Sequence, residues 1–500
     1  MTSVQAAGTS VTNTVTDGTP SPDVGPVPVP PSRSDATVSR ASRAIGGAWG
    51  RHAGVGKRAW WTPLRIILAM TSLTLLLGFV EKSPCSTAQW TGNKQYTHMC
   101  YSDVVPLWSD ERLDVGAVPY RDTAVEYPVL TGGLMWLTAD LTRAVHAIDS
   151  RWSDVVIFGV LTALLLSACG LVAAAGTVQA AARRPYDAAI FALSPLLVLH
   201  AFTNWDLLAM GLTSGALWAW ARRKPVLAGA LIGLGTAAKL YPIFIFLAIG
   251  ILAVRTRRYA PAVWAAIAAV LVWVMVNVPV ALAYYHGWSQ FYRFSLQRPA
   301  ERSTVWAMLR TVTSGSVRAQ DAPYWQPPSV AVALVLIAAL VAVAWIGLRA
   351  PVKPRLAQLA FLAVLAFLLT TKVWSPQYSL WLVPLVALAR PRWRLTLIWQ
   401  FTEIAVWILT LTLLLGFSEG QQAHGIAYGW LMVVILVRDA LLVAIASLII
   451  REMWHPELDV VRAGADVDDP GGGFFDGAPD YPPSPRLTAR SQADAAVPQY

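Results

Sequence analysis

The sequence predicts an all-α, polytopic integral membrane protein with about 12 transmembrane helices. Of its 500 residues, 55% are hydrophobic and only 14% are charged, and the mean hydropathy is +0.49. This composition excludes an ordinary soluble domain. The formal charge is +10, but lysines and arginines stand in short clusters between apolar runs. That pattern is typical of cytoplasmic loops and does not indicate nucleic-acid binding.

The basic clusters predict where each helix returns to the cytoplasm, beginning with a first helix at about 64–80 that leaves it. The other predicted spans lie near 153–180, 185–202, 205–221, 225–238, 241–254, 260–283, 329–348, 357–371, 377–390, 395–416 and 428–450. Residues 1–60 and 455–500 lack apolar periodicity and are predicted to be disordered tails around a membrane domain at 61–454. An even number of spans places both termini in the cytoplasm, as expected of a multi-pass plasma-membrane protein.

The segment at about 128–150 is helical in pattern but is not counted as a span. Asp140, Arg143 and Asp149 would each cost about 2.5–3.5 kcal/mol near a bilayer centre, far more than each neighbouring leucine or valine gains. An apolar stripe runs through it at helical spacing, formed by Leu134, Trp136, Leu137, Leu141 and Val145. We therefore expect an interfacial helix on the outer face, carried by the extracytoplasmic first loop.

Several predicted spans are shorter than the roughly 20 residues that cross a bilayer, so their ends should border a cavity. Three outward turns join these short helices and hold most of the polar residues near the apolar runs: His200, Asn204 and Asp206; Lys239; and Lys372, Gln377 and Tyr378. The inner halves of the helices look nearly featureless by comparison. The sequence thus predicts a site at the extracytoplasmic face.

The first outer loop, at about 81–127, supplies carboxylates. Cys85 and Cys100 are predicted to form a disulfide in an oxidising exterior, with two free thiols as the alternative. This bridge would hold Asp103 close to the membrane face, where a general base needs fixed placement. Asp103 could instead cap a turn. Glu126 is the reserve base, although its Glu-Tyr-Pro motif also suits a rigid turn.

A short series of motifs resembles glycosyltransferase family 87, a GT-C class family of polyprenol-phosphate-sugar-dependent enzymes that includes actinobacterial mannosyltransferases and an arabinofuranosyltransferase. The motifs are the outer-loop Asp103, Pro119-Tyr120, Glu126-Tyr127-Pro128, Asn204-Trp205-Asp206, Lys239-Leu240-Tyr241-Pro242 and Ser375-Pro376-Gln377-Tyr378. The resemblance covers about residues 60–450. The stretch Gln95–Asp103 and the cysteine pair depart from the mannosyltransferases, which indicates a divergent branch.

The resemblance implies an inverting transfer from a polyprenyl-phosphate sugar, mannose rather than arabinofuranose, to a lipid or glycan acceptor of the cell envelope. Asp103 matches the family's outer carboxylate and would act as the base. Lys239, Lys372 and Arg293 are candidates for gripping the donor phosphate, with Arg298 and Arg302 behind them.

The remaining polar residues of the outer turns suit sugar binding, but each has a structural alternative. His200, Asn204, Asp206, Gln377 and Tyr378 could contact sugar hydroxyls, or His200 could simply pair with Asp206. Tyr101, Trp205, Tyr241 and Trp374 could stack on a sugar or belong to an interfacial aromatic belt. The run at 284–293 is predicted to be an amphipathic helix along the surface.

Two other classes of function compete with a glycosyltransferase. A transporter or flippase for a lipid-linked envelope precursor also fits 12 spans with short helices, but would need polar residues near the midplane. A noncatalytic scaffold would leave the outer carboxylates unexplained. No cofactor is expected, because the His, Asp and Glu residues lack tight metal-ligand spacing, although a divalent metal stays open.

Overall fold

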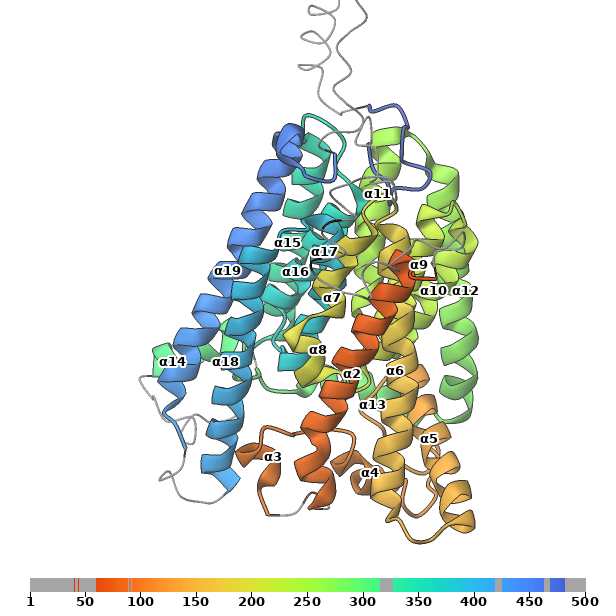
Figure 1. The fold of residues 1–500 in the computed structure, drawn as a ribbon, viewed down its shortest axis with the longest axis vertical. Helices are drawn as coiled ribbons and strands as arrows, with labels where there is room; N and C mark the ends of the chain where they lie inside the picture. The colour runs from red at the N-terminus through yellow and green to blue at the C-terminus, as the bar shows by residue number, and fades with distance from the viewer. Residues whose placement is uncertain are drawn as a thin grey trace, which may run out of the picture. The chain divides into compact units, whose positions relative to one another are not determined.

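The computed structural model describes residues 40, 44, 60–88, 90, 92–314, 327–418, 425–462 and 468–481. The chain divides into two units, 1–61 and 62–500. Nearly all of the first unit, which holds the predicted N-terminal tail, lies outside the described residues. The described part of the second unit is helical without a β-strand, and an isolated bridge joins Pro119 to Thr123 (Figure 1).

Six helices in the described residues are long and apolar enough to cross a membrane. They are α2 (Pro63–Thr87), α6 (Asp154–Ala180), α12 (Tyr259–Ala283), α15 (Ser329–Arg349), α18 (Trp393–Ser418) and α19 (Tyr428–Trp454). Each matches a predicted span, and the prediction of an all-α polytopic membrane protein is confirmed.

The other six predicted spans are short or broken helices. They are η1 (Pro185–Ala188) with α7 (Ala189–Ala192) and α8 (Pro195–His200), α9 (Asp206–Ala221), α10 (Pro225–Ala238), η2 (Tyr241–Phe244) with α11 (Ile245–Thr256), α16 (Leu356–Thr370), and η3 (Pro376–Trp381) with α17 (Leu382–Ala389). The predicted continuous helix at 185–202 is wrong because Pro195 interrupts it. Ser194 before that proline is extended, with φ −66° and ψ 124°.

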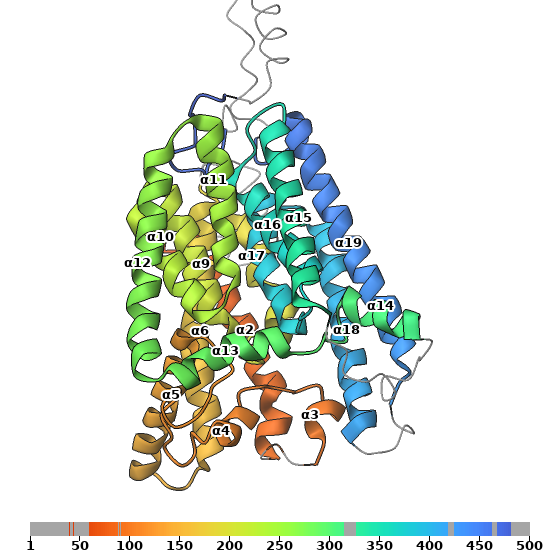
Figure 2. The same cartoon turned by 180° about the vertical axis from the view of Figure 1, so that it is seen from behind.

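The short helices lie inside the bundle and the long ones surround them (Figures 1 and 2). Every residue of α17 and most of α16 are buried. The long helices instead expose rows of large apolar side chains, such as Leu76 and Leu77 of α2 or Leu334 and Ile337 of α15. In a membrane these rows face lipid. The inner helices are shielded from lipid, so they can end at polar turns within the depth of the membrane.

One end of the bundle, which we call the loop end, holds the remaining helices: α3 (Lys94–Thr97), α4 (Pro106–Asp110), α5 (Val129–Ile148), α13 (Tyr285–Gln297) and α14 (Val305–Ser314). The helix α13 crosses the bundle at this end (Figure 2) and packs tightly on the first loop. A Cβ at Gly287 would lie 2.1 Å from the Tyr120 carbonyl oxygen, so only glycine fits there. The predicted amphipathic helix at 284–293 therefore exists and continues to Gln297.

The predicted helix at 128–150 is α5, and it is not among the candidate spans. It packs along the first half of α6 (Figure 1). The buried face consists of Met135 and of small and polar residues, including Thr131, Thr138 and Ala139. The predicted apolar stripe points outward, with Trp136 41% and Leu137 45% exposed.

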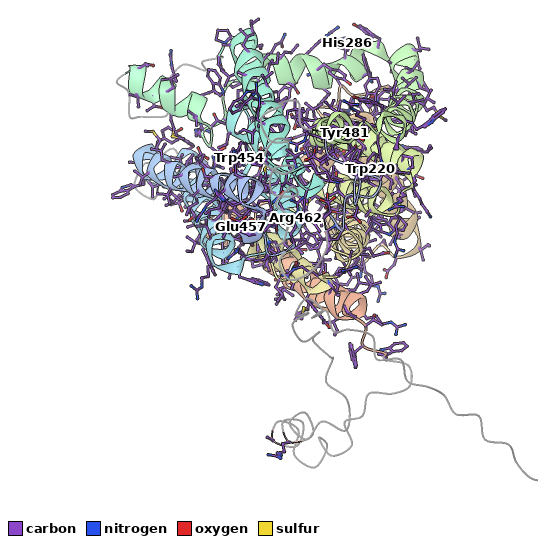
Figure 3. The ribbon with its side chains drawn as sticks, turned by 90° about the horizontal axis from the view of Figure 1, so that it is seen from above. Trp220, His286, Trp454, Glu457, Arg462 and Tyr481 are labelled. Carbon is purple, nitrogen blue, oxygen red and sulfur yellow. A yellow bond between two sulfur atoms is a disulfide. The ribbon has the colours of Figure 1, made fainter. Side chains whose placement is uncertain are left out.

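The opposite end, which we call the tail end, corrects the prediction of a disordered segment from residue 455. A short helix η5 (Pro456–Leu458) and the segment 468–481 pack against the ends of the bundle helices (Figure 3). Phe475 is 1% exposed and contacts Trp220, whose Nε1 donates to the Gly472 carbonyl at 3.0 Å. Residues 463–467 and 482–500 of the predicted tail lie outside the described residues.

The tail end also corrects the prediction that the inner halves are featureless. Arg255 is fully buried and Arg355 is 2% exposed, although both belong to the clusters that mark loops in the sequence. Their guanidinium groups pair with Asp480 and Asp459. The acidic residues of the C-terminal segment offset the desolvation cost of this burial, because each buried charge gains an opposite partner.

Candidate active site

The Asp103 carboxylate lies at the meeting point of three segments at the loop end. Its Oδ1 accepts from the Tyr101 hydroxyl at 2.7 Å, and its Oδ2 accepts from Asn204 Nδ2 at 2.7 Å and Gln377 Nε2 at 3.3 Å. Asn204 lies in the turn before α9, and Gln377 lies in η3. A carboxylate has about four acceptor positions, so these three donors leave about one free. The side chain is partly exposed, and a substrate hydroxyl can use that position.

The backbone around Asp103 is held from two sides. The structure contains the predicted Cys85–Cys100 disulfide, which ties the loop to α2. The Asp103 N–H donates to the Thr203 carbonyl at 2.7 Å, and the Ser102 hydroxyl donates to the Phe202 carbonyl at 2.8 Å. Closing a loop of this length stabilises a fold by about 3 kcal/mol. The carboxylate is therefore pre-positioned, as a general base requires.

Lys239 lies beside this carboxylate in a cage of aromatic rings. Its ammonium is 5.2 Å from the centre of the Tyr127 ring and 5.1 Å from that of Tyr378. The nearest anion in the described residues is Asp206, with 3.5 Å between Lys239 Nζ and Asp206 Oδ1. Asp206 Oδ1 also accepts from Trp381 Nε1 at 2.9 Å, which fixes the carboxylate. Lys239 is only 6% exposed, but its ammonium has three protons and this single ion-pair partner in the described residues, so it keeps capacity to bind an anion.

The five aromatic residues considered for sugar stacking divide into two groups. Trp205, Tyr241 and Trp374 are at most 1% exposed and belong to the core. Tyr101 and Tyr378 are partly exposed beside Asp103 and Lys239. Of the five, this second group alone has exposed surface beside Asp103 and Lys239, although Tyr378 also stacks on Trp381 and Tyr101 on Tyr96.

Two further carboxylates belong to the loops of this end. Burial raises the pKa of Glu126, against the opposing attraction of Arg298 and Lys239. Burial likewise raises the pKa of Glu301, whose Oε1 accepts from the Ser375 hydroxyl at 3.0 Å and lies 3.3 Å from Arg298. Glu126 is partly exposed, and its role as a reserve base stays a prediction.

The predicted phosphate-binding cations are not all placed together. Lys372 is buried, and its Nζ donates to the Leu296 carbonyl at 2.7 Å, so it caps the last turn of α13. Burial lowers the pKa of Lys372, and the charge of Arg298 lowers it further. Arg293 is exposed on α13, with its guanidinium 6.0 Å from the Tyr285 ring, and none of its described contacts is to the Asp103 group. Arg298, five residues later, directly follows α13 and lies 3.3 Å from Glu301.

Two further predicted partners lie apart from the site. Arg302 is exposed and stacks on Phe417 at 4.8 Å. His200 is fully buried, with its ring 4.8 Å from that of Trp407, and neither ring nitrogen has a hydrogen-bond partner in the described residues. The predicted pairing of His200 with Asp206 is wrong, because Asp206 faces Lys239 and Trp381.

The sequence analysis did not identify a buried charged cluster formed by Glu403 of α18 and by Arg438 and Asp439 of α19. The Ser379 hydroxyl donates to Glu403 Oε1 at 2.6 Å, and the guanidinium of Arg438 lies 3.7 Å from the centre of the Trp374 ring. Arg438 also pairs with Asp439 at 2.9 Å. These contacts hold η3, which carries Gln377 and Tyr378. Charged residues in the middle of the predicted spans 395–416 and 428–450 were the signal that could have identified it.

Tyr127 and Glu301 are the other site residues that the sequence analysis did not single out as functional contacts. The Tyr127 hydroxyl accepts from Asn204 Nδ2 at 2.8 Å, so it shares a donor group with Asp103. Its place in the Glu-Tyr-Pro motif was a usable signal. In the described residues, no group of three or more His, Cys, Asp or Glu side chains is placed to hold a metal ion.

A model of glycosyltransferase family 87 matches residues 127–376, which is half of the chain. Asn204, Lys239 and Arg298 lie within the match. Asp103 and Glu126 precede it, and Gln377 follows it directly. No curated protein matches the chain.

Proposed function

The chain belongs to glycosyltransferase family 87, and we propose that it transfers a sugar from a polyprenyl phosphate to an acceptor hydroxyl with Asp103 as general base. That the protein is a membrane glycosyltransferase follows from the family and from its apolar spans. This membership favours the predicted glycosyltransferase over the alternatives of a transporter or a scaffold. The donor, the direction of transfer and the roles of individual residues form the proposal.

One observation carries the proposal: a carboxylate held by three donors, with an acceptor position free, beside a caged ammonium. The acceptor hydroxyl gives its proton to Asp103 as its oxygen bonds to the anomeric carbon of the donor sugar. The bond from that carbon to the phosphate oxygen breaks, and the phosphate leaves with the electron pair. Attack opposite the leaving group inverts the anomeric carbon. Tyr101, Asn204 and Gln377 keep the carboxylate oriented for this step.

The departing phosphate needs positive charge close to the base. Lys239, between the Tyr127 and Tyr378 rings, and Arg298, 3.3 Å from Glu301, provide it in our proposal. Lys372 supports them indirectly by fixing the end of α13, next to Arg298. Mannose rather than arabinofuranose is the proposed sugar, on the strength of the motif resemblance, with an envelope lipid or glycan as acceptor.

The test is release of the lipid phosphate from defined donors. Purified protein is incubated with polyprenyl phosphates that carry mannose, arabinofuranose, glucose or galactose, together with an alkyl glycoside acceptor, and both products are measured. Transfer from mannosyl donor, with the inverted anomeric configuration seen by NMR, supports the proposal. Turnover with nucleotide sugars alone would contradict it.

The proposed sidedness places the loop end outside and both termini in the cytoplasm of the plasma membrane. The basic clusters near Arg222 and Arg257 lie at the tail end, where Arg223 contacts Gly473 and Arg257 contacts Tyr481, as the positive-inside pattern requires. In a Cys169→Ala background, an impermeant maleimide added to intact cells should label Ser109→Cys and spare Arg222→Cys. Both positions are exposed. The reverse labelling would place the site on the cytoplasmic face.

A further inference from the structure

An open cavity of about 120 Å³ lies between α2 and α6 at the loop end. Most of its wall is apolar, with Phe79 on α2, Val155 and Val160 on α6, and Phe202 and Val104 at its inner end. Hydroxyl groups of α2, from Ser83, Ser86 and Thr87, also line it. The cavity is thus a groove with an apolar wall and a polar strip.

The surroundings of this groove decide what can reach it. Both α2 and α6 are candidate membrane spans. Large apolar side chains next to the groove on α2 are exposed, with Leu76 58% and Val80 55%. A groove between two such helices opens to hydrocarbon, so a lipid chain is the ligand that enters it.

The groove is built partly from the turn that carries the proposed base. Ser102, Val104 and Val105 line it. The intervening Asp103 points its carboxylate to Asn204 and Gln377. A chain lying in the groove therefore places its headgroup beside this turn.

The positions of the charged side chains indicate whether the donor lipid or the acceptor lipid occupies the groove. The cation that lines the groove is Lys82, and it is already used: its Nζ lies 2.9 Å from Glu81 and donates to the Tyr101 and Leu199 carbonyls at 2.9 and 3.1 Å. Lys239 and Arg298 do not line the groove; they pair with Asp206 at 3.5 Å and with Glu301 at 3.3 Å. A donor must bring its phosphate to a cation, whereas an acceptor must bring a hydroxyl to the base.

We propose that the groove between α2 and α6 holds the hydrocarbon chain of the acceptor lipid, which makes lipid length a determinant of acceptor specificity. This inference rests on the proposed function. The donor chain then approaches from another side of the site.

Gly159 provides a direct test because it lines the groove and a Cβ there would meet no heavy atom within 4 Å. Gly159→Leu fills the groove without a backbone clash. Gly250 of α11 is equally open and does not line the groove, so Gly250→Leu is the matched control. Ser83→Leu blocks the groove from α2 if Gly159→Leu fails to fold.

The kinetic experiment uses hexyl, octyl, decyl and dodecyl glycosides as acceptors. In the unmodified protein and in Gly250→Leu, KM should fall as the chain lengthens. Each buried methylene changes binding about 4-fold, so Gly159→Leu should raise KM for the dodecyl acceptor about 10-fold and leave the hexyl and donor KM values nearly unchanged. An increase confined to the donor KM, or no change in any KM, overturns the proposal.

A second readout needs no turnover. A dodecyl glycoside with a diazirine at the chain end should label the α6 peptide that contains Val155 and Val160. Asp103→Asn should be labelled equally, and Gly159→Leu several-fold less. Labelling with no sugar transfer would refute the proposed function alone, whereas transfer without labelling of α6 would refute the groove alone.

Discussion

Both ends of the bundle bury charged side chains, but they satisfy them to different degrees. At the tail end, Arg355 donates to Asp459 at 2.6 Å and to the Leu388 and Ala389 carbonyls at 2.8 and 2.6 Å. At the loop end, Asp103 keeps an acceptor position, and Asp206 Oδ2 has no partner in the described residues. Fully paired charges hold helices together, whereas partly paired charges retain capacity for a ligand.

The difference also shows in how each end is assembled. Asp459, Asp469 and Asp480 come from the C-terminal segment and pair with or cap elements far away in the chain. The role of these contacts at the tail end is therefore structural. The loop end joins the first loop, the turn before α9 and η3 around one carboxylate. Removing a charge around this carboxylate should therefore change the stability of the protein little but lower its activity.

Asp103→Asn makes the sharpest test of this contrast. Loss of a general base slows such reactions about 10²–10⁴-fold, so kcat should fall by about 10³-fold. The melting temperature in detergent should stay within about 2 °C, because the amide keeps an oxygen for Asn204. Asp110→Asn alters an exposed carboxylate of the same loop and should retain activity. Near-normal turnover of Asp103→Asn would remove Asp103 as the base.

Arg355→Met should show the opposite behaviour. Breaking a buried pair leaves an isolated carboxylate at Asp459, which costs about 3 kcal/mol in free energy of unfolding. Thermal or denaturant unfolding in detergent measures this loss, and KM of the folded fraction should not change. Arg394→Met, at an exposed arginine of the same end, is the control. The double variant Arg355→Met, Asp459→Leu should lose less than Arg355→Met, and an equal loss would show that the unpaired charge is not the cause.

The sequence was sufficient for the helices and for the centre of the site because both depend on local signals. The lengths of the apolar runs predicted the spans. The predicted topology placed Asp103, Asn204 and Gln377 at one end, where they are in contact. The break at Pro195 was readable but was overridden by the apolar pattern. Arg298 was ranked below Arg293 because the choice depends on which face of α13 meets the bundle, and that is decided by packing at Gly287.

Pairings between residues far apart in the chain could not be predicted from the sequence. Arg355 and Asp459 are 104 residues apart, and each appears in isolation as a loop residue. The acidic tail looked disordered because its stability comes from buried partners rather than from periodicity. His200 was misplaced for the same reason, since its neighbour Trp407 lies on α18.

The pH dependence of stability offers a smaller test at the loop end. Burial raises the pKa of Glu111 to about 7, although the Glu126 N–H hydrogen bond opposes the shift. The folded state therefore binds a proton that the unfolded state has lost, and the free energy of unfolding falls as pH rises from about 4.5 through 7. Glu111→Gln should remove this dependence and raise stability at pH 8 by about 2 kcal/mol after allowance for solvent screening. Unfolding at pH 5 and pH 8 measures it, and an unchanged slope would contradict the assignment.

The smallest expected effect concerns the orientation of the base. Tyr101→Phe removes one of the three donors to Asp103, the hydroxyl at 2.7 Å, and leaves the ring in place. A hydrogen bond to a charged group contributes about 1.5 kcal/mol, so kcat/KM should fall about 10-fold. Tyr96 stacks on Tyr101 at 6.3 Å, and Tyr96→Phe is the matched control. A loss as large as that of Asp103→Asn would mean that Tyr101 takes part in the proton transfer, and no loss would mean that two donors suffice to hold the carboxylate.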